Sequence, residues 1–455
     1  MDERDLQIAE KDRRIAELER LLSQALEALK IALERISELE RRLGLNSGNS
    51  SKPPSSDGFR KKPSPKSLRC AGQNPSGGQK GHPGHTLKQT ENPDKLVVHE
   101  VEICTSCQKS LADIPVSKRI RRQVLDIPEP KIEVTEHQIE VKTCSCGCEN
   151  AGVFPKGVTA PVQYGDRVSA LTVYLSVQQL IPEDRLQEVF ADVFGLKIST
   201  ATIVTIQETF ATRVLPQVEA TLQELKLCDV KHLDETGLRI AGKTQWAHVI
   251  SSEDATHYRV SQKRGDLLNG LQGTIVHDHW KPYFTLTELK HALCNAHHLR
   301  ELKSLEEQEE AWAFKMSDLL RTISHHLSAD SGLRPLPIFS PQYDEIVAEG
   351  LAFHASKYPF PKSKRGRQKR HPGHNLLLRF KNFKDAVLRC ITDPNVPFTN
   401  NQAERDIRMM KVKQKISGSF RTLNGAQIFC TIRSFISTQK KLNLNLFNSI
   451  QLALA

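Results

Sequence analysis

The sequence predicts a multidomain protein whose largest part is an α/β domain with a helical insertion. Three observations predict it: apolar residues that recur every seven positions near the N-terminus, two clusters of cysteines between residues 104 and 148, and a series of short β-branched runs after residue 226. At 455 residues, the chain is longer than one ordinary domain. The expected bounds are 1–45 for a coiled-coil dimerisation helix, 46–95 for a basic linker, 96–155 for a cysteine-containing module, 160–220 for a helical region, and 226–446 for the α/β domain, interrupted by helices at about 300–395.

The first 45 residues carry a heptad repeat. Its a positions hold Ile8, Ile15, Leu22, Leu29, Ile36 and Leu43, and its d positions hold Leu18, Ala25, Ala32 and Leu39. In this register Arg14 and Arg35 are at g, and Glu19 and Glu40 are at the following e positions. Opposite charges there favour a parallel partner, so we predict a homodimer or a higher oligomer formed through a coiled coil. An amphipathic helix docked on the body of the protein is the alternative.

The segment 46–95 is rich in Ser, Pro, Gly and Lys and has no hydrophobic period. Such a composition cannot bury enough apolar surface to offset the entropy of ordering the chain. We therefore expect a mostly unstructured, positively charged linker.

The next module contains two clusters of cysteines. Cys104 and Cys107 form a C-x2-C pair, and Cys144, Cys146 and Cys148 follow about 37 residues later. Two such clusters fit a tetrahedral structural Zn²⁺ site, in which the metal supplies folding energy to a small module. The expected ligands of this zinc-finger-like module are Cys104, Cys107, Cys144 and either Cys146 or Cys148. Free thiols in a degenerate finger are the alternative.

Residues 160–220 show apolar residues at steps of three and four, the period of amphipathic helices. Gly195 ends one predicted helix, and Ser199 caps the next. Short helices joined by tight turns can form a helix-turn-helix, whose last helix enters the major groove of DNA. This region is therefore a candidate helical DNA-binding region, with core packing as an equally weighted alternative.

The α/β domain begins with strand patterns around two aspartates. The stretches on both sides of Asp234 predict a strand, a tight Gly-containing turn and a second strand; THYRV is a third, and the run GTIVHD ends at Asp278. A three-stranded meander followed by a fourth strand is the core order of a ribonuclease-H-like sheet. The ends of its first and fourth strands lie side by side, so we expect Asp234 and Asp278 to meet. The stretch from Cys294 to about Pro394 has a helical period and predicts the insertion.

A third acidic residue, Glu404, lies on a predicted helix with Thr399 or Asn400 as its N-cap. Glu404, Arg408, Lys411 and Lys415 recur at steps of four, three and four, which places them on one helix face. A carboxylate thus shares its face with three cations. A solvated charged helix is the alternative reading of this face.

Three carboxylates on two strands and a late helix are the donors that a two-metal site needs. Two divalent cations about 4 Å apart require hard oxygen ligands from different elements and clamp the attacking and leaving oxygens of a displacement at phosphorus. We therefore predict that Asp234, Asp278 and Glu404 bind two Mg²⁺ or Mn²⁺ ions and act on a nucleic-acid phosphodiester. The formal net charge of +11 and the clustered Lys and Arg residues favour a DNA partner.

Five segments, in this order along the chain, resemble those of a known family. They are LNSGNSSKPPSSDG at 45–58, GGQKGHPGHTL at 77–87, HLDETG at 232–237, CNAHHLREL at 294–302 and TNNQAERDIR at 399–408. Together they resemble the large transposase of the IS-sixty-six-like group of bacterial insertion sequences. The resemblance implies a DDE transposase whose catalytic carboxylates are Asp234, Asp278 and Glu404. The CSCGC run departs from the family's second C-x2-C pair, which leaves the fourth zinc ligand open.

The resemblance also implies partners and DNA-binding residues. It places His297 and Arg300 near DNA phosphates, and the helix of Glu404 adds further cations. The expected DNA-binding residues are Arg405, Arg408, Lys411, Lys415, His297 and Arg300. The expected substrates are transposon ends and target DNA, and accessory transposition proteins encoded nearby are expected partners.

Two other classes of protein share these features. A metal-dependent nuclease would hydrolyse DNA without joining it, and a DNA-binding regulator would keep the architecture without catalysis. No apolar run of 18 residues and no signal peptide occur in the sequence. We therefore expect a cytoplasmic, nucleoid-associated bacterial protein that does not contact a membrane.

Overall fold

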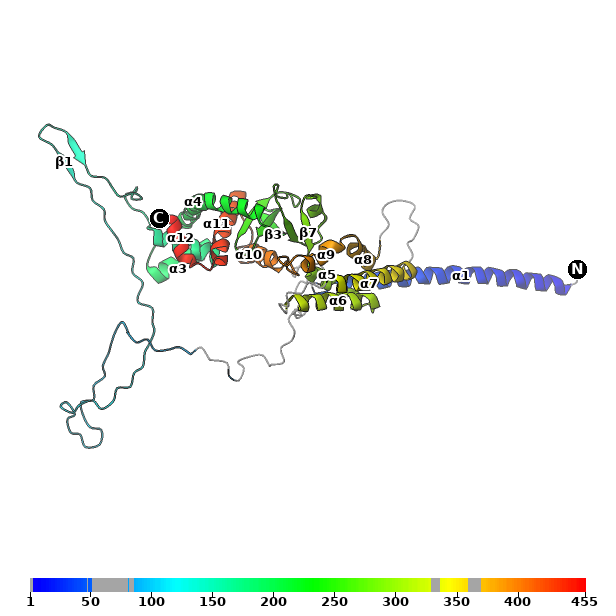
Figure 1. The fold of residues 1–455 in the computed structure, drawn as a ribbon, viewed down its shortest axis with the longest axis horizontal. Helices are drawn as coiled ribbons and strands as arrows, with labels where there is room; N and C mark the ends of the chain where they lie inside the picture. Colours follow the sequence, from blue (N-terminus) through cyan, green and yellow to red (C-terminus); the bar gives the residue numbers. More distant parts are fainter. Residues whose placement is uncertain (1–2, 47, 51–80, 82–85, 329–335, 359–369) are drawn as a thin grey trace. The chain divides into compact units, whose positions relative to one another are not determined.

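A long helix, α1 (Glu3–Gly44), opens the chain (Figure 1). Its sequence is dominated by Ala, Leu, Glu, Lys and Arg, which are strong helix formers. The apolar heptad residues are exposed along it: Leu22 is 61% exposed and Leu29 is 55% exposed. The predicted helix is therefore confirmed, and its pairing with a second copy stays a prediction.

The structure is a computed structural model that describes residues 3–46, 48–50, 81, 86–328, 336–358 and 370–455. It divides into two units, each of which we describe by itself. The first unit comprises Met1–Arg69, Val158–Gln187 and Ile198–Ala455, and the second comprises Cys70–Gly157 and Glu188–Lys197. Most of the predicted basic linker lies outside the described residues. No helix among the described residues is long and apolar enough to cross a membrane.

A five-stranded sheet with the order β5-β4-β3-β6-β7 forms the centre of the first unit. Its strands are β3 (Val230–Ile240), β4 (Lys243–Ser251), β5 (Thr256–Ser261), β6 (Thr274–His277) and β7 (Lys290–Leu293). The pairs β3–β4 and β4–β5 are antiparallel, and β3–β6 and β6–β7 are parallel. The predicted meander is thus present, and its fourth strand pairs with the first. The strand β7, four residues long and just before the predicted insertion, was not predicted from the sequence.

Two local features set the register of β3. Ala241 and Gly242 have φ values of 48° and 74°, the left-handed conformation that a two-residue hairpin turn requires between β3 and β4. In the parallel pair with β6, His232 lies opposite Val276. Two residues further along both strands, Asp234 and Asp278 therefore reach the same edge of the sheet.

Helices and the sheet bury one apolar core together. The helices of this layer are α2 (Asp166–Val173), the π-helical turn η2 (Tyr174–Gln178), α4 (Thr200–Leu227), α10 (Asn401–Ser417), α11 (Leu423–Lys441) and α12 (Leu446–Leu454). The predicted cap of α4 is confirmed, because the side chain of Ser199 accepts a hydrogen bond from the backbone N–H of Thr202. Leu238 and Ile240 of β3 face this core, whereas Leu233 packs on the opposite face with Tyr283. Side chains alternate along a strand, so Asp234 lies on the face that α10 covers.

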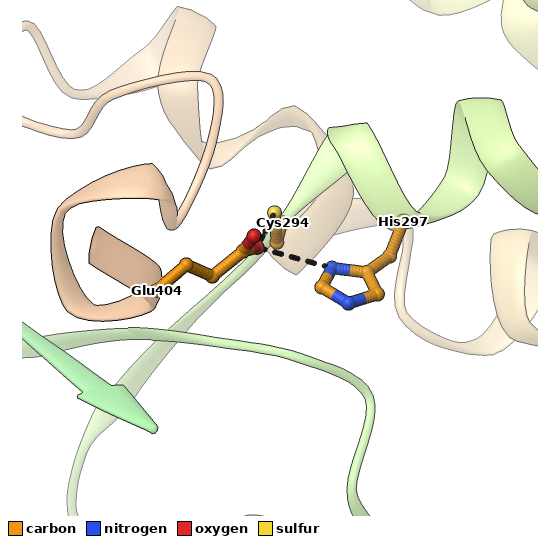
Figure 2. Close-up of side chains that lie close together, drawn as sticks. All are labelled: Cys294, His297 and Glu404. Atoms are coloured by element: carbon orange, nitrogen blue, oxygen red, sulfur yellow. Dashed lines mark hydrogen bonds and ion pairs between the residues drawn. The ribbon is translucent and has the colours of Figure 1, made fainter. Parts of the chain in front are cut away.

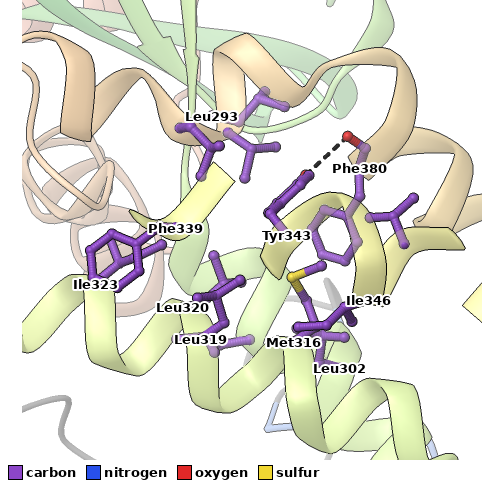
Figure 3. Close-up of a cluster of buried hydrophobic side chains, with 14 of the residues drawn as sticks. Leu293, Leu302, Met316, Leu319, Leu320, Ile323, Phe339, Tyr343, Ile346 and Phe380 are labelled. Atoms are coloured by element: carbon purple, nitrogen blue, oxygen red, sulfur yellow. Dashed lines mark hydrogen bonds between the residues drawn. The ribbon is translucent and has the colours of Figure 1, made fainter. Parts of the chain in front are cut away.

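A second core lies among helices between β7 and α10. They are α5 (Asn295–Glu306), α6 (Ala311–Ser328), α7 (Leu336–Lys357), α8 (Pro372–Asn382) and α9 (Lys384–Thr392). Figure 3 shows Met316, Tyr343 and Phe380 meeting in this core, where the Tyr343 hydroxyl donates a 2.9 Å hydrogen bond to the carbonyl of Phe380. A tightly packed core of this kind gives the insertion a fixed shape next to the sheet edge.

The cysteine-containing segment belongs to the second unit. Its strands β1 (Val141–Thr143) and β2 (Glu149–Ala151) form an antiparallel hairpin in which Val141 lies opposite Ala151. Helix α3 (Glu183–Phe194) ends immediately before Gly195, as the sequence predicts. The residues of β1 and β2 are exposed, so this small module has little apolar core of its own.

Candidate active site

Asp234 is the acidic residue whose pKa is shifted most by its surroundings among the described residues. Burial raises the pKa of its carboxyl group well above the usual range, and the charges of Glu235, Asp278 and Glu404 raise it further. The acidic groups of two strands and a helix therefore act on one another at one edge of the sheet. Mutual repulsion between desolvated carboxylates is relieved by protons or by bound cations.

Asp278 follows β6 at the start of a tight turn. Its Oδ1 accepts a 2.9 Å hydrogen bond from the backbone N–H of Trp280, which fixes the orientation of the carboxyl group. Burial raises the pKa of Asp278, and that hydrogen bond and the charge of Arg264 partly offset the rise. The short 3-10 helix η3 (Lys281–Thr285) then leads away from the site.

Glu404 lies in the first turn of α10, and Asn400 holds this end of the helix against β3. The Asn400 Nδ2 donates a 2.8 Å hydrogen bond to the carbonyl of Leu233, and its Oδ1 lies 2.8 Å from Nδ1 of His232. Asn400 occupies the predicted N-cap position, but its side chain makes no capping hydrogen bond. The predicted N-cap residue is therefore confirmed, and both polar atoms of its side-chain amide bind β3.

Three side chains of the insertion approach the carboxylate of Glu404, and Figure 2 shows two of them, Cys294 and His297. Its Oε1 lies 3.7 Å from Sγ of Cys294, 3.6 Å from Nδ1 of His297 and 3.6 Å from Nη2 of Arg300. Burial lowers the pKa of His297 to about 3 and raises the pKa of Cys294 to about 12. At neutral pH, Arg300 is therefore the positive group at Glu404, while the imidazole and the thiol are neutral.

Among the described residues, Asp234, Asp278 and Glu404 are not one of the groups whose ligand atoms all lie within 4.8 Å of one another. The binding of two divalent cations by these three residues stays a prediction. Two ions about 4 Å apart need a wider set of donors than one ion does. Carboxylate oxygens are hard ligands that suit Mg²⁺ or Mn²⁺. Cys294 and His297 do lie within 4.8 Å of Glu404, and they add softer donors beside it.

Glu235, Arg264 and Tyr283 form a group of side chains on the opposite face of β3. This group was not predicted from the sequence. Glu235 Oε1 accepts a 2.6 Å hydrogen bond from Nη2 of Arg264 and a 2.9 Å one from Nε. Tyr283 donates its hydroxyl hydrogen to the other oxygen of Glu235. The guanidinium of Arg264 also stacks on Trp280, 4.3 Å from the ring centre. Glu235 lies in the HLDETG segment, whereas Arg264 lies in a turn and Tyr283 in η3, and neither of these two belongs to a recognisable motif.

The predicted cationic face of α10 is divided between two roles. Arg405, Arg408 and Lys415 are exposed to solvent. Lys411 instead donates a hydrogen bond to the carbonyl of Gly237 in β3, and burial lowers the pKa of its ammonium group. Lys411 therefore fastens α10 to the sheet, and its predicted contact with a DNA phosphate stays a prediction.

The cysteines form two tight turns in the second unit. The backbone N–H of Gln108 donates a 3.0 Å hydrogen bond to the carbonyl of Cys104. In the second turn, the N–H of Cys144 donates a 2.8 Å hydrogen bond to the carbonyl of Cys148. Hydrogen bonds from Cys107 lower the pKa of the Cys104 thiol, and hydrogen bonds from Cys146 lower that of Cys144. A lowered pKa favours the thiolate form that binds a metal, and the choice between Cys146 and Cys148 as the fourth ligand stays open. Among the described residues, two groups of three side chains could each hold a metal ion. Neither group contains one of these five cysteines.

Comparisons with known proteins fit these features. A model of the zinc-finger binding domain of transposase IS66 matches residues 102–148, which include all five of these cysteines. A family of unknown function (DUF6444) matches residues 2–88, the span of α1 and the predicted linker. Among curated proteins, the uncharacterized protein y4jO of Sinorhizobium fredii (strain NBRC 101917 / NGR234) is 33% identical over 73 residues, which cover 16% of this chain and 23% of that relative.

The largest match covers both the sheet and the helices around it. A model described as Transposase IS66 family matches residues 161–428, more than half of the chain. This range contains the acidic residues of the sheet edge and the first turn of α10. The chain therefore belongs to the IS66 family of transposases.

Proposed function

We propose that this protein is a DDE transposase that binds the ends of an insertion sequence and catalyses metal-dependent cleavage and strand transfer of DNA. The observation that carries the proposal is the parallel pairing of β3 with β6, which puts Asp234 and Asp278 in the same register, together with the 2.8 Å hydrogen bond from Asn400 at the start of α10 to Leu233. The sheet order and the parallel pairing of β3 with β6 support a ribonuclease-H-like domain over 226–446.

In this proposal Asp234, Asp278 and Glu404 hold two Mg²⁺ or Mn²⁺ ions. When bound, the ions activate the attacking oxygen and stabilise the leaving oxygen of the phosphodiester. The chain's own residues position these ligands. Asn400 fixes the start of α10 on β3, and the N–H of Trp280 orients Asp278. Arg300 balances the charge of Glu404 from the insertion.

The exposed cations of α10 supply contacts to DNA in the same proposal. Arg405 and Arg408 lie in the turns next to Glu404, and Lys415 lies near the end of the helix. Phosphate contacts of this kind position DNA without reading its sequence. His297 and Arg300 sit against the carboxylate of Glu404, and we assign them to its orientation before any contact with phosphates.

The remaining modules complete the assignment. The exposed apolar seam of α1 supports a parallel coiled coil between two copies of the chain. The two cysteine turns and the matched zinc-finger domain support a structural Zn²⁺ held by Cys104, Cys107, Cys144 and either Cys146 or Cys148. The helices α2 and α4 of the region 160–220 pack with the sheet, which supports the core-packing alternative, and a contact of this region with transposon ends stays a prediction. Accessory transposition proteins remain expected partners.

The experiment that tests the function compares wild type with Glu404→Gln on labelled transposon-end DNA in the presence of Mn²⁺. Glu288→Gln, at an exposed position outside the site, is the matched control. We expect joined products from wild type and from the control, and none from Glu404→Gln. Nicked DNA without joined products would instead indicate a nuclease. Binding without either product would indicate a regulator.

A further inference from the structure

A second cluster of potential metal ligands lies inside the helical insertion, away from the acidic edge. It consists of Glu310, His354 and His371, whose ligand atoms all lie within 4.8 Å of one another. Glu310 immediately precedes α6, His354 lies in the last turn of α7, and His371 is the N-cap of α8. The cluster therefore joins three helix ends that are separate in the sequence.

The cluster is closed to solvent. The side chains of Glu310 and His354 are 0% exposed, and that of His371 is 14% exposed. Nε2 of His354 lies 3.0 Å from Oε2 of Glu310, and Nδ1 of His371 lies 4.0 Å from Oε1. A Cβ at Gly373 would come within 2.8 Å of the His354 ring, so only glycine allows α8 to approach this closely.

Among the described residues, no Lys or Arg forms an ion pair with Glu310. Within the described chain, its ion-pair partners are the two histidines, which are charged only when protonated. Its Oε1 is buried and accepts no hydrogen bond there, and Nδ1 of His354 is likewise buried without a hydrogen-bond partner. A buried carboxylate with an unsatisfied oxygen is costly unless it is paired or coordinates a metal.

We propose that Glu310, His354 and His371 bind a Zn²⁺-type divalent transition-metal ion that fastens α6, α7 and α8 together. Two imidazoles and a carboxylate form a donor set typical of such ions. The ion would neutralise Glu310 and bind its buried Oε1, which accepts no hydrogen bond in the described chain. It leaves one coordination position for water or a further ligand.

Three neighbouring groups orient the cluster. Nδ1 of His371 accepts a 3.2 Å hydrogen bond from the N–H of Gly373, and an ion bound at this nitrogen would replace that hydrogen bond. The indole N–H of Trp312 donates a 2.8 Å hydrogen bond to Oε2 of Glu310, the kind of outer contact that orients metal-binding carboxylates. The ring of Tyr358 stacks on His371 with 4.5 Å between the ring centres, which fixes the imidazole from the end of α7.

The position of the cluster gives the ion a specific structural role. In the sequence, His354 and His371 flank a basic stretch with six cations: Lys362, Lys364, Arg365, Arg367, Lys369 and Arg370. A metal bound to both histidines would hold the two ends of this stretch together. The ion would thereby stabilise the insertion by linking the last turn of α7 to the start of α8.

The first test measures the zinc content of the purified full-length chain. His371→Asn removes the imidazole, while asparagine remains a good N-cap for α8. His326→Asn, on α6 with its ring against Phe339, is the matched control. We expect His371→Asn to lose one zinc equivalent relative to wild type and to the control. An unchanged zinc content in His371→Asn would overturn the proposal.

Cobalt separates this site from the cysteine module. In a Cys104→Ser, Cys107→Ser, Glu404→Gln variant, added Co²⁺ should give visible absorption without the charge-transfer band of thiolate ligands. Adding His371→Asn should remove that absorption. No cobalt absorption in the first variant, with circular dichroism showing an intact fold, would mean that the cluster is a metal-free Glu–His pair. Both readouts are independent of DNA cleavage, so they can fail without affecting the proposed transposase function.

Discussion

The side-chain amide of Asn400 donates a 2.8 Å hydrogen bond to the backbone carbonyl of Leu233, the residue before Asp234. Through this one bond, the start of α10 is fixed relative to the strand that carries the first acidic residue. The distance along the chain between the bonded residues is 167 positions. The position of Glu404 relative to Asp234 therefore depends on a contact that local sequence does not display.

Asn400→Ala should weaken both the fold and the activity. The change leaves the buried imidazole of His232 and the carbonyl of Leu233 without their partner, a loss on the order of 1–3 kcal/mol in the free energy of unfolding. We expect lower stability in urea denaturation and a larger relative loss in DNA cleavage. Asn395→Ala, at an exposed position before α10, is the control. Equal effects of the two changes would contradict this role for Asn400.

Asp234→Asn should stabilise the metal-free protein while abolishing cleavage. The substitution removes a desolvated charge that Glu235, Asp278 and Glu404 repel. Wild type should gain thermal stability when Mg²⁺ is added, because the ions offset this repulsion, and Asp234→Asn should gain much less. Melting temperatures with and without Mg²⁺ measure both effects. Retained cleavage by Asp234→Asn would show that another residue is catalytic.

Arg264→Lys should reduce cleavage by about 100-fold through misplacement of the acidic groups. Lysine cannot reproduce the two hydrogen bonds that Arg264 makes with Glu235 or its stacking on Trp280. The control is Arg259→Lys, which alters a pair with Asp266 farther from the carboxylates. Cleavage rates of the two variants at saturating metal provide the comparison, and comparable rates would argue against a positioning role.

Arg408→Ala and Lys411→Ala should separate DNA contact from helix packing. Arg408 is exposed, so its loss should weaken DNA binding. The slope of log affinity against log salt concentration should fall by about 1, the contribution of one phosphate contact. Lys411 binds the carbonyl of Gly237, so its loss should lower the stability of the fold and leave the salt dependence nearly unchanged. Binding isotherms at several salt concentrations decide the assignment. The reverse pattern would place Lys411 on the DNA.

His248 should make the sheet sensitive to acid. Burial and the charge of Arg259 lower its pKa from 6.5 to about 4. Between these values the unfolded chain binds more protons than the folded one, so the free energy of unfolding falls as the pH drops from 6.5 towards 4. His248→Gln should make this fall less steep, whereas His325→Gln at an exposed position of α6 should not. Urea denaturation at several pH values measures the slope.

Local patterns in the sequence were enough for several parts of the fold. The heptad repeat predicts α1, and the glycine-containing turn near Gly242 predicts the β3–β4 hairpin. The strand order predicts that Asp234 and Asp278 reach one edge of the sheet. Side-chain periodicity and turn chemistry act within a few residues, so these features can be read from one stretch of chain at a time.

Other parts of the site could not be predicted from single stretches. The strand β7 is four residues long and lacks a distinct pattern. Arg264 and Tyr283 carry no motif, yet both bind Glu235. Lys411 fits a cationic helix face by its spacing, but burial against β3 gives it a structural partner instead.

The sequence by itself determined the order of the modules, the family resemblance and the three acidic residues, because each depends on residue types at short or recognisable spacings. Only the tertiary structure decided which side chains surround those acids and which form the cluster of Glu310, His354 and His371. Burial and charge pairing arise between segments far apart in the chain, so they follow from packing and not from local pattern.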